Sequence, residues 1–202
     1  TITTHEPVTK EEAWKQAEGL VDRLGISPSR LTEYPHQFSG GMRQRTMISL
    51  ALALDSDLII ADEPTTSLDV IVEAQILDLL KELKAAYDMT LILITHNMGI
   101  VAELVDRVAV MYAAKIVEVA DALDLFANPL HPYTQGLLKS VPNIKLLDQE
   151  FEIMKGSPPD LIDPPTGCRF HPRCAYVMDI CSEVGPPLKR VENGTMVACH
   201  LY

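Results

Sequence analysis

Hydrophobic positions at the start of the chain recur at the spacing of an α-helix. Thr9 followed by Glu12 forms a capping box, and Gly25 marks an end. The apolar positions between them are Ala13, Ala17, Leu20, Val21 and Leu24. After a loop that contains Pro28 and Pro35, residues 42–54 favour helix throughout, and Ser39-Gly40-Gly41 precedes them. The pattern predicts a helical region up to about Leu54.

The pattern then changes to short apolar runs that alternate with helical periods. Residues 58–61 form an apolar run between acidic residues, and residues 90–94 form another. Each run predicts a strand that is buried on both faces. Residues 70–87 return to a helical period, and Asn97 is placed to cap a further helix through about Val105. Two strands joined by a helix predict a right-handed, parallel βαβ unit.

Residues 108–111 and 115–119 predict a closing hairpin at the edge of this sheet. From Asn128 onward proline becomes frequent and the alternation of strand and helix is lost, so we expect a boundary near Ala127. The fold class is therefore α/β. We expect a helical subdomain at 1–54, half of a parallel-sheet core at 55–127 and a loop-rich extension at 128–202.

Composition narrows the possible functions. The chain has 202 residues, which is enough for one sizeable core, and a formal net charge of −11. This charge argues against a protein that coats nucleic acid or anionic lipid. No apolar run approaches the length of a spanning helix, and the N-terminus lacks the pattern of a signal peptide, so we expect a soluble, intracellular chain.

Candidate chemistry lies where the two predicted strands end, because ligands of parallel sheets bind at the carboxyl ends of the strands. Asp62 and Glu63 follow the first strand, and His96 follows the second. Asp62 and Glu63 alone are compatible with a solvated turn, and His96 alone with a structural histidine. In a nucleotide site, such an Asp holds Mg²⁺ and the adjacent Glu positions and deprotonates the attacking water.

Ser39-Gly40-Gly41 offers a hydroxyl, unhindered backbone amides and the start of a helix, which together suit a phosphate. The alternative is an ordinary helix cap that is followed by a flexible pair of glycines. This short motif alone does not distinguish a phosphate site from a cap.

Over residues 36–118 the order and spacing of these segments resemble the ABC ATPase family. Phe38-Ser39-Gly40-Gly41-Met42 resembles the signature loop, residues 58–62 resemble the Walker B strand, and Ser67-Leu68-Asp69 resembles the D-loop. The resemblance implies that Asp62 binds Mg²⁺, that Glu63 is the catalytic base and that His96 is the switch histidine at the terminal phosphate. Ser39, Gly40, Gly41 and Asp69 are implied in binding ATP across a dimer of ATPase domains.

Residues 36–45 and His131-Pro132-Tyr133-Thr134 narrow the resemblance to the dipeptide and oligopeptide importer branch. This branch implies an ATPase homodimer or heterodimer, two transmembrane permease subunits, an extracytoplasmic peptide-binding protein and a peripheral position on the cytoplasmic face of the cell membrane. The chain's four cysteines, Cys168, Cys174, Cys181 and Cys199, all lie in the last 35 residues. Clustered thiols in a reducing compartment indicate a metal or a cluster rather than disulfides. The branch implies a [4Fe-4S] cluster on these cysteines, while four thiolates also suit Zn²⁺, and His171 and His200 leave mixed ligation open.

One motif of the family is missing from the sequence. The chain contains no Gly-Lys pair and therefore no phosphate-binding loop of the form G-x4-G-K-[ST] (Walker A), and the glutamine loop is also missing. We expect the chain to be a fragment that begins inside the helical subdomain and is inactive alone. Two alternatives remain open: a soluble ABC ATPase outside transport, and a metal-binding or redox module on an ATPase remnant.

Overall fold

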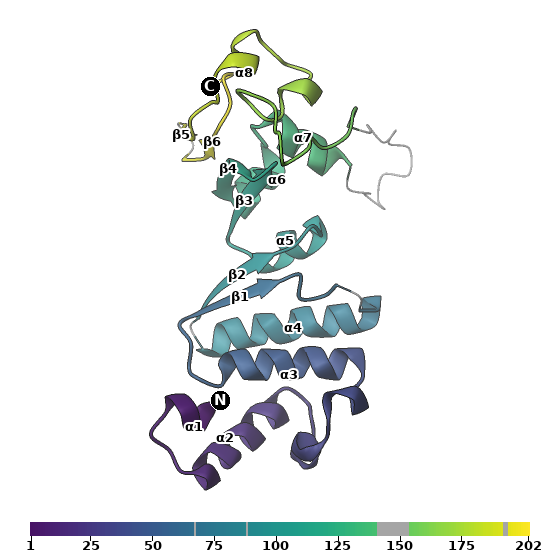
Figure 1. Cartoon of the computed structure of the whole chain (residues 1–202), viewed down its shortest axis with the longest axis vertical. Helices are drawn as coiled ribbons and strands as arrows, with labels where there is room; N and C mark the ends of the chain where they lie inside the picture. The colour runs from purple at the N-terminus through teal and green to yellow at the C-terminus, as the bar shows by residue number, and fades with distance from the viewer. Residues whose placement is uncertain (67, 88, 141–153, 192–193) are drawn as a thin grey trace. The chain divides into compact units, whose positions relative to one another are not determined.

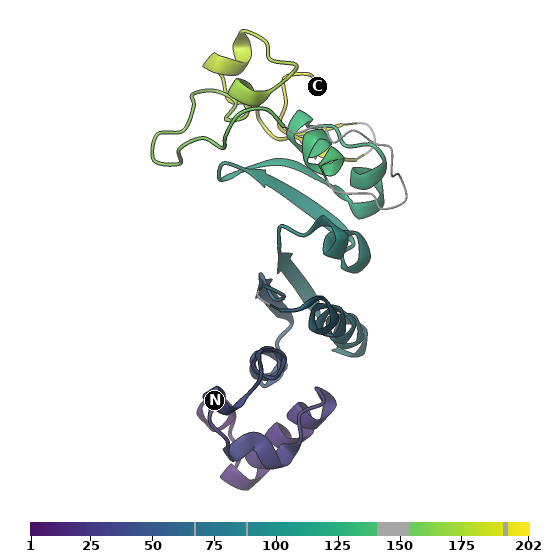
Figure 2. The ribbon, with the colours of Figure 1, turned by 90° about the vertical axis from the view of Figure 1, so that its right-hand side faces the viewer.

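A computed structural model describes residues 1–66, 68–87, 89–140, 154–191 and 194–202. Residue contacts divide the chain into two compact units, residues 1–96 and residues 97–202. Figures 1 and 2 show the helices and strands of each unit. The predicted division into three parts stays a prediction. Within the described residues, no helix is both long and apolar enough to cross a membrane.

The first unit begins with helices whose ends follow their capping residues. α1 (Ile2–His5) precedes α2 (Lys10–Arg23), and Thr9 and Glu12 form the predicted capping box at the start of α2. Gly25 takes a φ of 71° just after α2, a conformation that glycine adopts without strain. Arg45 of α3 (Gly40–Leu52) donates a 2.7 Å hydrogen bond to the carbonyl of Leu24. The helical region is thus confirmed, with the second helix beginning and ending slightly earlier than predicted.

The predicted βαβ unit is present. β1 (Leu58–Asp62) pairs in parallel with β2 (Thr90–Ile94), in a register that runs from Leu58 opposite Thr90 to Asp62 opposite Ile94. The connecting helix α4 (Val70–Tyr87) buries Ile76, Leu79, Leu80 and Leu83. In both views α4 lies alongside the sheet, and α3 contacts α4 (Figures 1 and 2).

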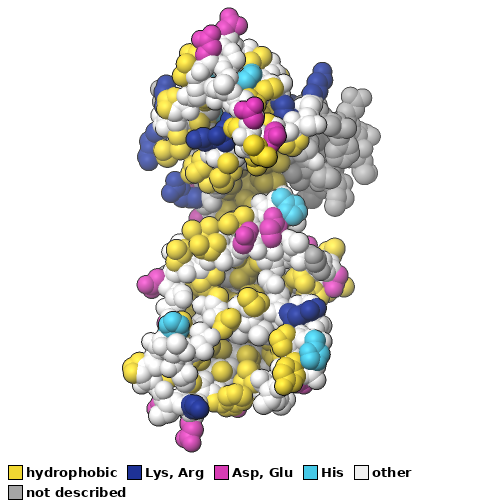
Figure 3. All heavy atoms as spheres, in the orientation of Figure 1, with side chains coloured by type: hydrophobic (Ala, Val, Ile, Leu, Met, Phe, Trp, Pro, Cys, Tyr) yellow, Lys and Arg dark blue, Asp and Glu magenta, His cyan; other side chains and the backbone are white. Residues whose placement is uncertain are grey.

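The prediction that both strands are buried on both faces is wrong for this chain. Leu58, Ile60, Ile92 and Ile94 are 45–61% exposed, and exposed positions alternate with half-buried ones along each strand. Alternation follows from the pleat, which places successive side chains on opposite faces. One face of this two-stranded sheet therefore carries apolar side chains that the described chain leaves open, and Figure 3 shows hydrophobic surface over these strands.

The second unit begins with α5 (Met98–Leu104), which Asn97 caps as predicted through a 3.0 Å bond from the Gly99 amide. The predicted hairpin is present as β3 (Arg107–Tyr112) and β4 (Lys115–Asp121). Its predicted place at the edge of the βαβ sheet is wrong. The hairpin belongs to a separate sheet of order β3-β4-β6-β5, whose other strands are β5 (Lys189–Arg190) and β6 (Met196–Val197) from the end of the chain.

The chain after the hairpin contains more helix than its sequence pattern indicated. α6 (Ala122–Ala127) follows β4 directly. Pro132 opens α7 (Pro132–Lys139), where its fixed φ and missing N–H are tolerated, and His131 caps that helix. The remaining elements are η3 (His171–Arg173) and α8 (Ile180–Glu183).

The extension builds its core together with the hairpin rather than by itself. Phe170 is buried and packs edge-on against Tyr112 of β3, with ring centroids 5.1 Å apart. Tyr133 of α7 lies 4.6 Å from the same tyrosine ring. Arg169 adds a hydrogen bond to the carbonyl of Ala113 at the hairpin turn. Apolar side chains from β3, β4, α6, α7 and the segment around Phe170 therefore share one cluster, which also includes Val110, Val117, Ala120 and Leu125.

A buried carboxylate fixes the start of α7. Glu118 of β4 is fully buried, and its two oxygens accept hydrogen bonds from the amides of Leu130 at 2.8 Å and His131 at 2.9 Å. Burial also lowers the pKa of His131 to about 4, so its ring is neutral at pH 7 and Nδ1 accepts a hydrogen bond from the Tyr133 amide. Two backbone amides at the helix start thus depend on one side chain.

We predict that Glu118→Ala lowers the free energy of unfolding of the second unit by about 3 kcal/mol, because it leaves two buried amides without an acceptor. Glu118→Gln should cost less, since the amide oxygen can still accept one of the bonds. Urea denaturation, monitored through hydrogen exchange of the amides of residues 107–137, measures the effect. The single tryptophan, Trp14, lies in the first unit, so its fluorescence transition serves as the control and should not move. A loss below about 0.5 kcal/mol for Glu118→Ala would contradict this role for Glu118.

Candidate functional site

The parallel pairing brings the predicted catalytic residues together at one edge of the sheet. Asp62 is the last residue of β1 and pairs with Ile94, and the Glu63 amide donates a 2.9 Å hydrogen bond to the Ile94 carbonyl. His96 follows β2 by two residues, and its Nδ1 lies 2.8 Å from Oε1 of Glu63. The structure therefore joins Glu63 directly to His96, while the exposed Asp62 lies at the same strand ends.

The backbone of Glu63 is in an unusual conformation. Its φ is 47°, in the left-handed region that a residue with a side chain rarely adopts. The Glu63 carbonyl accepts a 3.1 Å hydrogen bond from the Thr66 amide, which closes a turn directly after β1. Local strain of this kind costs about 1–3 kcal/mol and persists where the surrounding structure determines the conformation. Here the bond to Ile94 and the turn to Thr66 hold Glu63 on both sides.

The two oxygens of the Glu63 carboxylate have different partners. Oε1 accepts from His96, and Oε2 accepts a 2.9 Å bond from the hydroxyl of Thr66. These two hydrogen bonds, with that of His96 the stronger influence, lower the pKa of Glu63 below its usual value. The carboxylate is therefore ionised at neutral pH and accepts from Nδ1 of His96, whose side chain is 82% exposed and open to a ligand. Sequence reasoning missed Thr66, although a hydroxyl three residues after the candidate base is a signal that could have indicated it.

Asp69 of the predicted D-loop holds the start of a helix. The carboxylate of Asp69 accepts hydrogen bonds from the amides of Ile71 at 3.1 Å and Val72 at 3.0 Å. Asp69 thus caps the start of α4. Ser67, the first residue of the predicted D-loop, lies outside the described residues. A contact of Asp69 with ATP stays a prediction.

The candidate signature loop lies at the start of α3. Ser39 is the N-cap residue, and its hydroxyl accepts a 3.3 Å hydrogen bond from the Met42 amide. Ser39 and Gly40 are exposed. A Cβ on Gly40 would lie 3.7 Å from Leu68, an ordinary contact, whereas a Cβ on Gly41 would lie only 2.8 Å from Cγ1 of Val72 in α4. The second glycine is therefore required by packing against α4, and the first leaves its backbone open to a ligand.

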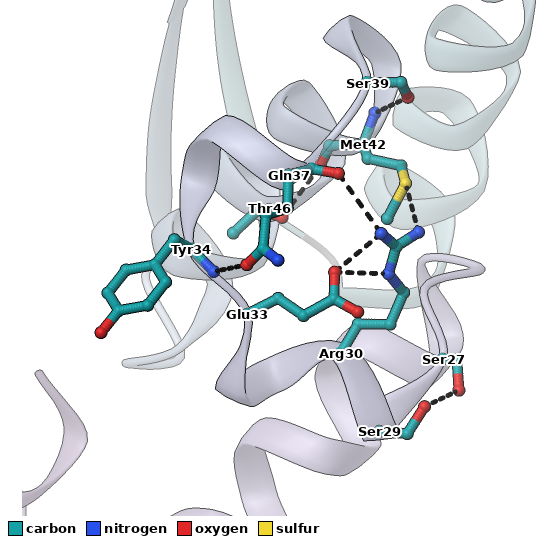
Figure 4. A network of polar contacts seen from close by, with 9 residues as sticks. All are labelled: Ser27, Ser29, Arg30, Glu33, Tyr34, Gln37, Ser39, Met42 and Thr46. Carbon is teal, nitrogen blue, oxygen red and sulfur yellow. Dashed lines mark hydrogen bonds and ion pairs between the residues drawn. The ribbon is translucent and has the colours of Figure 1, made fainter.

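The loop is held by contacts that the sequence did not indicate. Figure 4 shows Arg30, which precedes the loop, between Glu33, Gln37 and Met42. Among the hydrogen bonds and ion pairs of the described residues, none joins Ser39, Gly40 or Gly41 to Asp62, Glu63 or His96. The two sets of candidate residues are separate within the first unit, although the chain supplies both.

The four cysteines, which lie up to 31 positions apart in sequence, gather in the second unit. Cys168, Cys174, Cys181 and Cys199 all line one small pocket of about 10 Å³, together with His131, His171 and His200. All four thiols are free, and the Cys168 amide donates a 2.8 Å bond to the carbonyl of Cys181. Burial raises the pKa of Cys168, Cys174 and Cys199, so these thiols are protonated unless a cation stabilises their thiolates.

The chemistry of this set suits a soft metal centre, because convergent thiols are its usual ligands. Within the described ranges, however, no group of three or more His, Cys, Asp or Glu side chains is placed to hold a metal ion. The residue types are those of a soft-metal site, but their arrangement in the described ranges does not form one.

Two family models match the chain and together cover more than half of it. The model described as ABC transporter matches residues 1–66, and the one described as Oligopeptide/dipeptide transporter, C-terminal region, matches residues 117–181. With the parallel sheet, its helices and the acidic strand end, these matches define the class as an ABC ATPase fold. Residues 1–66 thus match the ABC transporter family, and residues 117–181 match the oligopeptide and dipeptide transporter C-terminal region.

Individual relatives agree with this assignment. The chain is 50% identical over 202 residues to the dipeptide transport ATP-binding protein DppD of Bacillus subtilis, covering 99% of this chain and 60% of the relative. It is 45% identical over 200 residues to the oligopeptide transport ATP-binding protein OppD of Salmonella typhimurium, covering 98% of this chain and 59% of that protein. The chain thus spans about 60% of the length of these curated relatives.

A solved structure is also similar. The structure of cbiO1 from Clostridium perfringens, described as part of the ABC transporter complex cbiONQ, aligns with a TM-score of 0.54 at 28% identity. The alignment covers 62% of this chain and 50% of that one. The predicted α/β fold class of an ABC ATPase domain is therefore confirmed.

We predict that Gly41→Ala lowers the free energy of unfolding of the first unit by about 1–3 kcal/mol, because the new methyl overlaps the branched side chain of Val72. Val72→Ala in the same chain should recover most of this loss. Gly40→Ala is the matched control and should be neutral or slightly stabilising, since it has room and alanine favours helix. Trp14 fluorescence during urea denaturation measures all of these variants. Equal losses for the two glycine substitutions would show that the contact with Val72 is not the cause.

We predict that His96→Ala raises the pKa of Glu63 toward the ordinary glutamate value, and that Thr66→Val raises it less, because the His96 bond has the larger influence. Carbon-13 NMR titration of the glutamate carboxylates measures the change, and His5→Ala serves as the control. The sign follows from the lowered pKa: the hydrogen bonds stabilise the folded chain above the ordinary glutamate pKa, and this contribution is lost as the pH falls through the lowered value. An unchanged Glu63 titration in His96→Ala would contradict the contact.

Proposed function

We propose that this chain is part of the ATP-hydrolysing subunit of an ABC importer for dipeptides or oligopeptides. The single observation that carries the proposal is the contact between Glu63 and His96 at 2.8 Å, directly beside Asp62 at the ends of two parallel strands. In this function Asp62 binds Mg²⁺, Glu63 orients and deprotonates the attacking water, and His96 contacts the terminal phosphate. The peptide branch rests on the match at residues 117–181 and on the printed names of the relatives.

The lowered pKa of Glu63 bears on the mechanism. A carboxylate that accepts two hydrogen bonds is a weak base, so Glu63 does not deprotonate bound water before the reaction begins. Phosphoryl transfer passes through a loose transition state, so its catalysis rests mainly on positioning the reactants and stabilising charge. Glu63 therefore acts first by holding water in line and accepts the proton as the new bond forms. The strained backbone and the two bonds to the carboxylate supply the fixed orientation that this role requires.

In the complete assembly, two ATPase domains bind ATP between them. Ser39, Gly40, Gly41 and Asp69 contribute to the site across the dimer, which is a homodimer or pairs this chain with a homologous subunit. Two transmembrane permease subunits and an extracytoplasmic peptide-binding protein complete the importer, and the ATPase lies at the cytoplasmic face of the membrane. The net charge of −11 supports the absence of a nucleic-acid partner. The division at 1–54, 55–127 and 128–202 belongs to this proposal.

We expect Glu63→Gln to keep ATP binding but to slow ATP hydrolysis by at least about a hundredfold, since an amide orients water but accepts no proton. The measurement is steady-state phosphate release by the assembly that contains this chain and a P-loop-bearing polypeptide.

The chain alone should neither bind ATP tightly nor hydrolyse it, because its sequence contains no G-x4-G-K-[ST]. Calorimetric titration of the chain with Mg-ATP tests this second point. Micromolar affinity and turnover by the pure chain would refute it, and full hydrolysis by Glu63→Gln would refute Glu63 as the base.

The finer proposal concerns the four cysteines, which would hold a [4Fe-4S] cluster, with Zn²⁺ as the alternative centre. Their convergence on one pocket supports a shared centre, and the cluster ranks first because of the family branch. When bound, either centre would cross-link the loops of the extension, and an iron-sulfur cluster would also be able to exchange an electron. The same convergence supports the second candidate function, a metal-binding or redox module on an ATPase scaffold.

We expect anaerobically purified protein to be brown and to contain iron and sulfide in equal amounts, and a zinc protein to be colourless. Cysteine-to-serine substitution at any one of the four positions should lower the metal content and raise protease sensitivity after about Ser157. The first unit, monitored by Trp14 fluorescence, should stay folded. Blank metal analysis together with four freely reactive thiols would exclude an inorganic centre. If transport continues without the cysteines, a redox module becomes the better interpretation of the extension.

A further inference from the structure

Arg30 belongs to none of the motifs that led to the proposed function. It lies in the short 3-10 helix η1 (Pro28–Thr32), ahead of the signature loop, and its side chain is 34% exposed. Such a position is typical of a surface arginine that contributes little to a fold. Arg30 differs from such a surface arginine because it contacts Gln37 and Met42, at the two ends of the signature loop (Figure 4).

Glu33 orients the guanidinium. Nε and Nη2 of Arg30 both donate to Oε2 of Glu33, at 2.9 and 2.7 Å. Glu33 directly follows η1, so the two charged groups are close in sequence and lose little freedom on pairing. The hydrogen bonds to Glu33 also raise the pKa of Arg30, which keeps the group charged at every pH of interest.

The remaining contacts of the guanidinium go to the loop. Nη2 donates to the carbonyl of Gln37 at 3.3 Å, just before Phe38-Ser39-Gly40-Gly41-Met42. Nη1 lies 3.2 Å from the sulfur of Met42, at the end of that segment. The face of the guanidinium lies over the ring of Phe38, with the central carbon 5.4 Å from the ring centroid.

These contacts need an arginine. The guanidinium is planar, so its edge donates hydrogen bonds in several directions while its face remains available to an aromatic ring. A lysine ammonium is a point charge that pairs with Glu33 but does not reach Gln37, Met42 and the Phe38 ring at the same time. Residues 40–42 form the first turn of α3, so the parts that Arg30 holds are the chain just before Ser39 and the side chain of Met42.

We propose that Arg30 is the positioning residue of the signature loop, fixing both of its ends so that Ser39 and the amides of Gly40 and Gly41 are presented to a phosphate. This inference rests on the proposed function in one respect: the phosphate belongs to ATP that the partner ATPase domain holds. Arg30 itself contacts no nucleotide in this role. It acts through Gln37, Phe38 and Met42.

The first arm of the test uses the chain itself and needs no ATP. In Arg30→Lys we expect the amides of Met42 and Arg43, which donate to Ser39, to exchange hydrogen about tenfold faster, because the ends of the loop are released. The NMR resonance of the Met42 methyl group, labelled with carbon-13, should also move. Trp14 fluorescence during denaturation should keep its midpoint. Arg23→Lys is the matched control, since Arg23 lies in the same unit and bonds instead to Tyr87 at 2.7 Å.

The second arm measures ATP hydrolysis by the assembly that contains a P-loop-bearing polypeptide. Arg30→Lys should lower kcat about fivefold and leave KM for ATP within about twofold, because the loop engages ATP only as the two domains close. Glu33→Gln should give a smaller effect of the same kind, and it replaces Arg30→Lys if that variant fails to fold. Arg23→Lys should hydrolyse ATP normally.

Unchanged exchange of the Met42 and Arg43 amides and an unmoved Met42 resonance in both variants would overturn the inference, whatever the ATPase result. A loosened loop with unchanged kcat would also overturn it, since the position of the loop would then not matter. An assembly that hydrolyses no ATP even with the unaltered chain would instead contradict the proposed function. In that case the exchange and methyl measurements still decide whether Arg30 holds the loop.

Discussion

The parallel pairing of β1 with β2 is the interaction on which the candidate active site depends. Their register places Asp62 opposite Ile94, and the Glu63 amide continues the pairing to the Ile94 carbonyl. Residues that are 33 positions apart in sequence, Glu63 and His96, therefore meet within hydrogen-bonding distance. A shift of one residue in this register would turn the strand side chains to the opposite face and would separate the two.

Glu63 illustrates how the local backbone serves the site. Its left-handed conformation is unfavourable for a residue with a side chain, and two backbone hydrogen bonds hold it there. The same turn brings the Thr66 hydroxyl to one oxygen of the carboxylate, while His96 contacts the other. The orientation of the carboxylate is thus determined before any ligand arrives, which suits a residue whose main task is to hold water in line.

The second unit is stabilised by contacts between its extension and the hairpin. Its proline-rich extension has few periodic apolar residues, so it packs its aromatic side chains against the hairpin, and Phe170 lies in contact with Tyr112 and Tyr133. The buried carboxylate of Glu118 satisfies the amides at the start of α7. The cysteines line a pocket beside this cluster, and burial raises the pKa of Cys168, Cys174 and Cys199.

Local sequence patterns were enough to predict α2 to α5, β1 to β4 and the candidate site residues, whereas they did not indicate α6, α7, β5 or β6. Thr9 with Glu12 predicted a cap, the period of residues 70–87 predicted α4, and the acidic end of the first apolar run predicted the site. Only the fold showed which sheet the hairpin joins, since that depends on contacts between distant segments. The hairpin therefore joined β6 instead of the βαβ sheet, and the apolar runs of β1 and β2 kept one open face. The same reason explains why Thr66 and Arg30 escaped sequence reasoning: their importance lies in the atoms that they meet in space, and no pattern along the chain records those contacts.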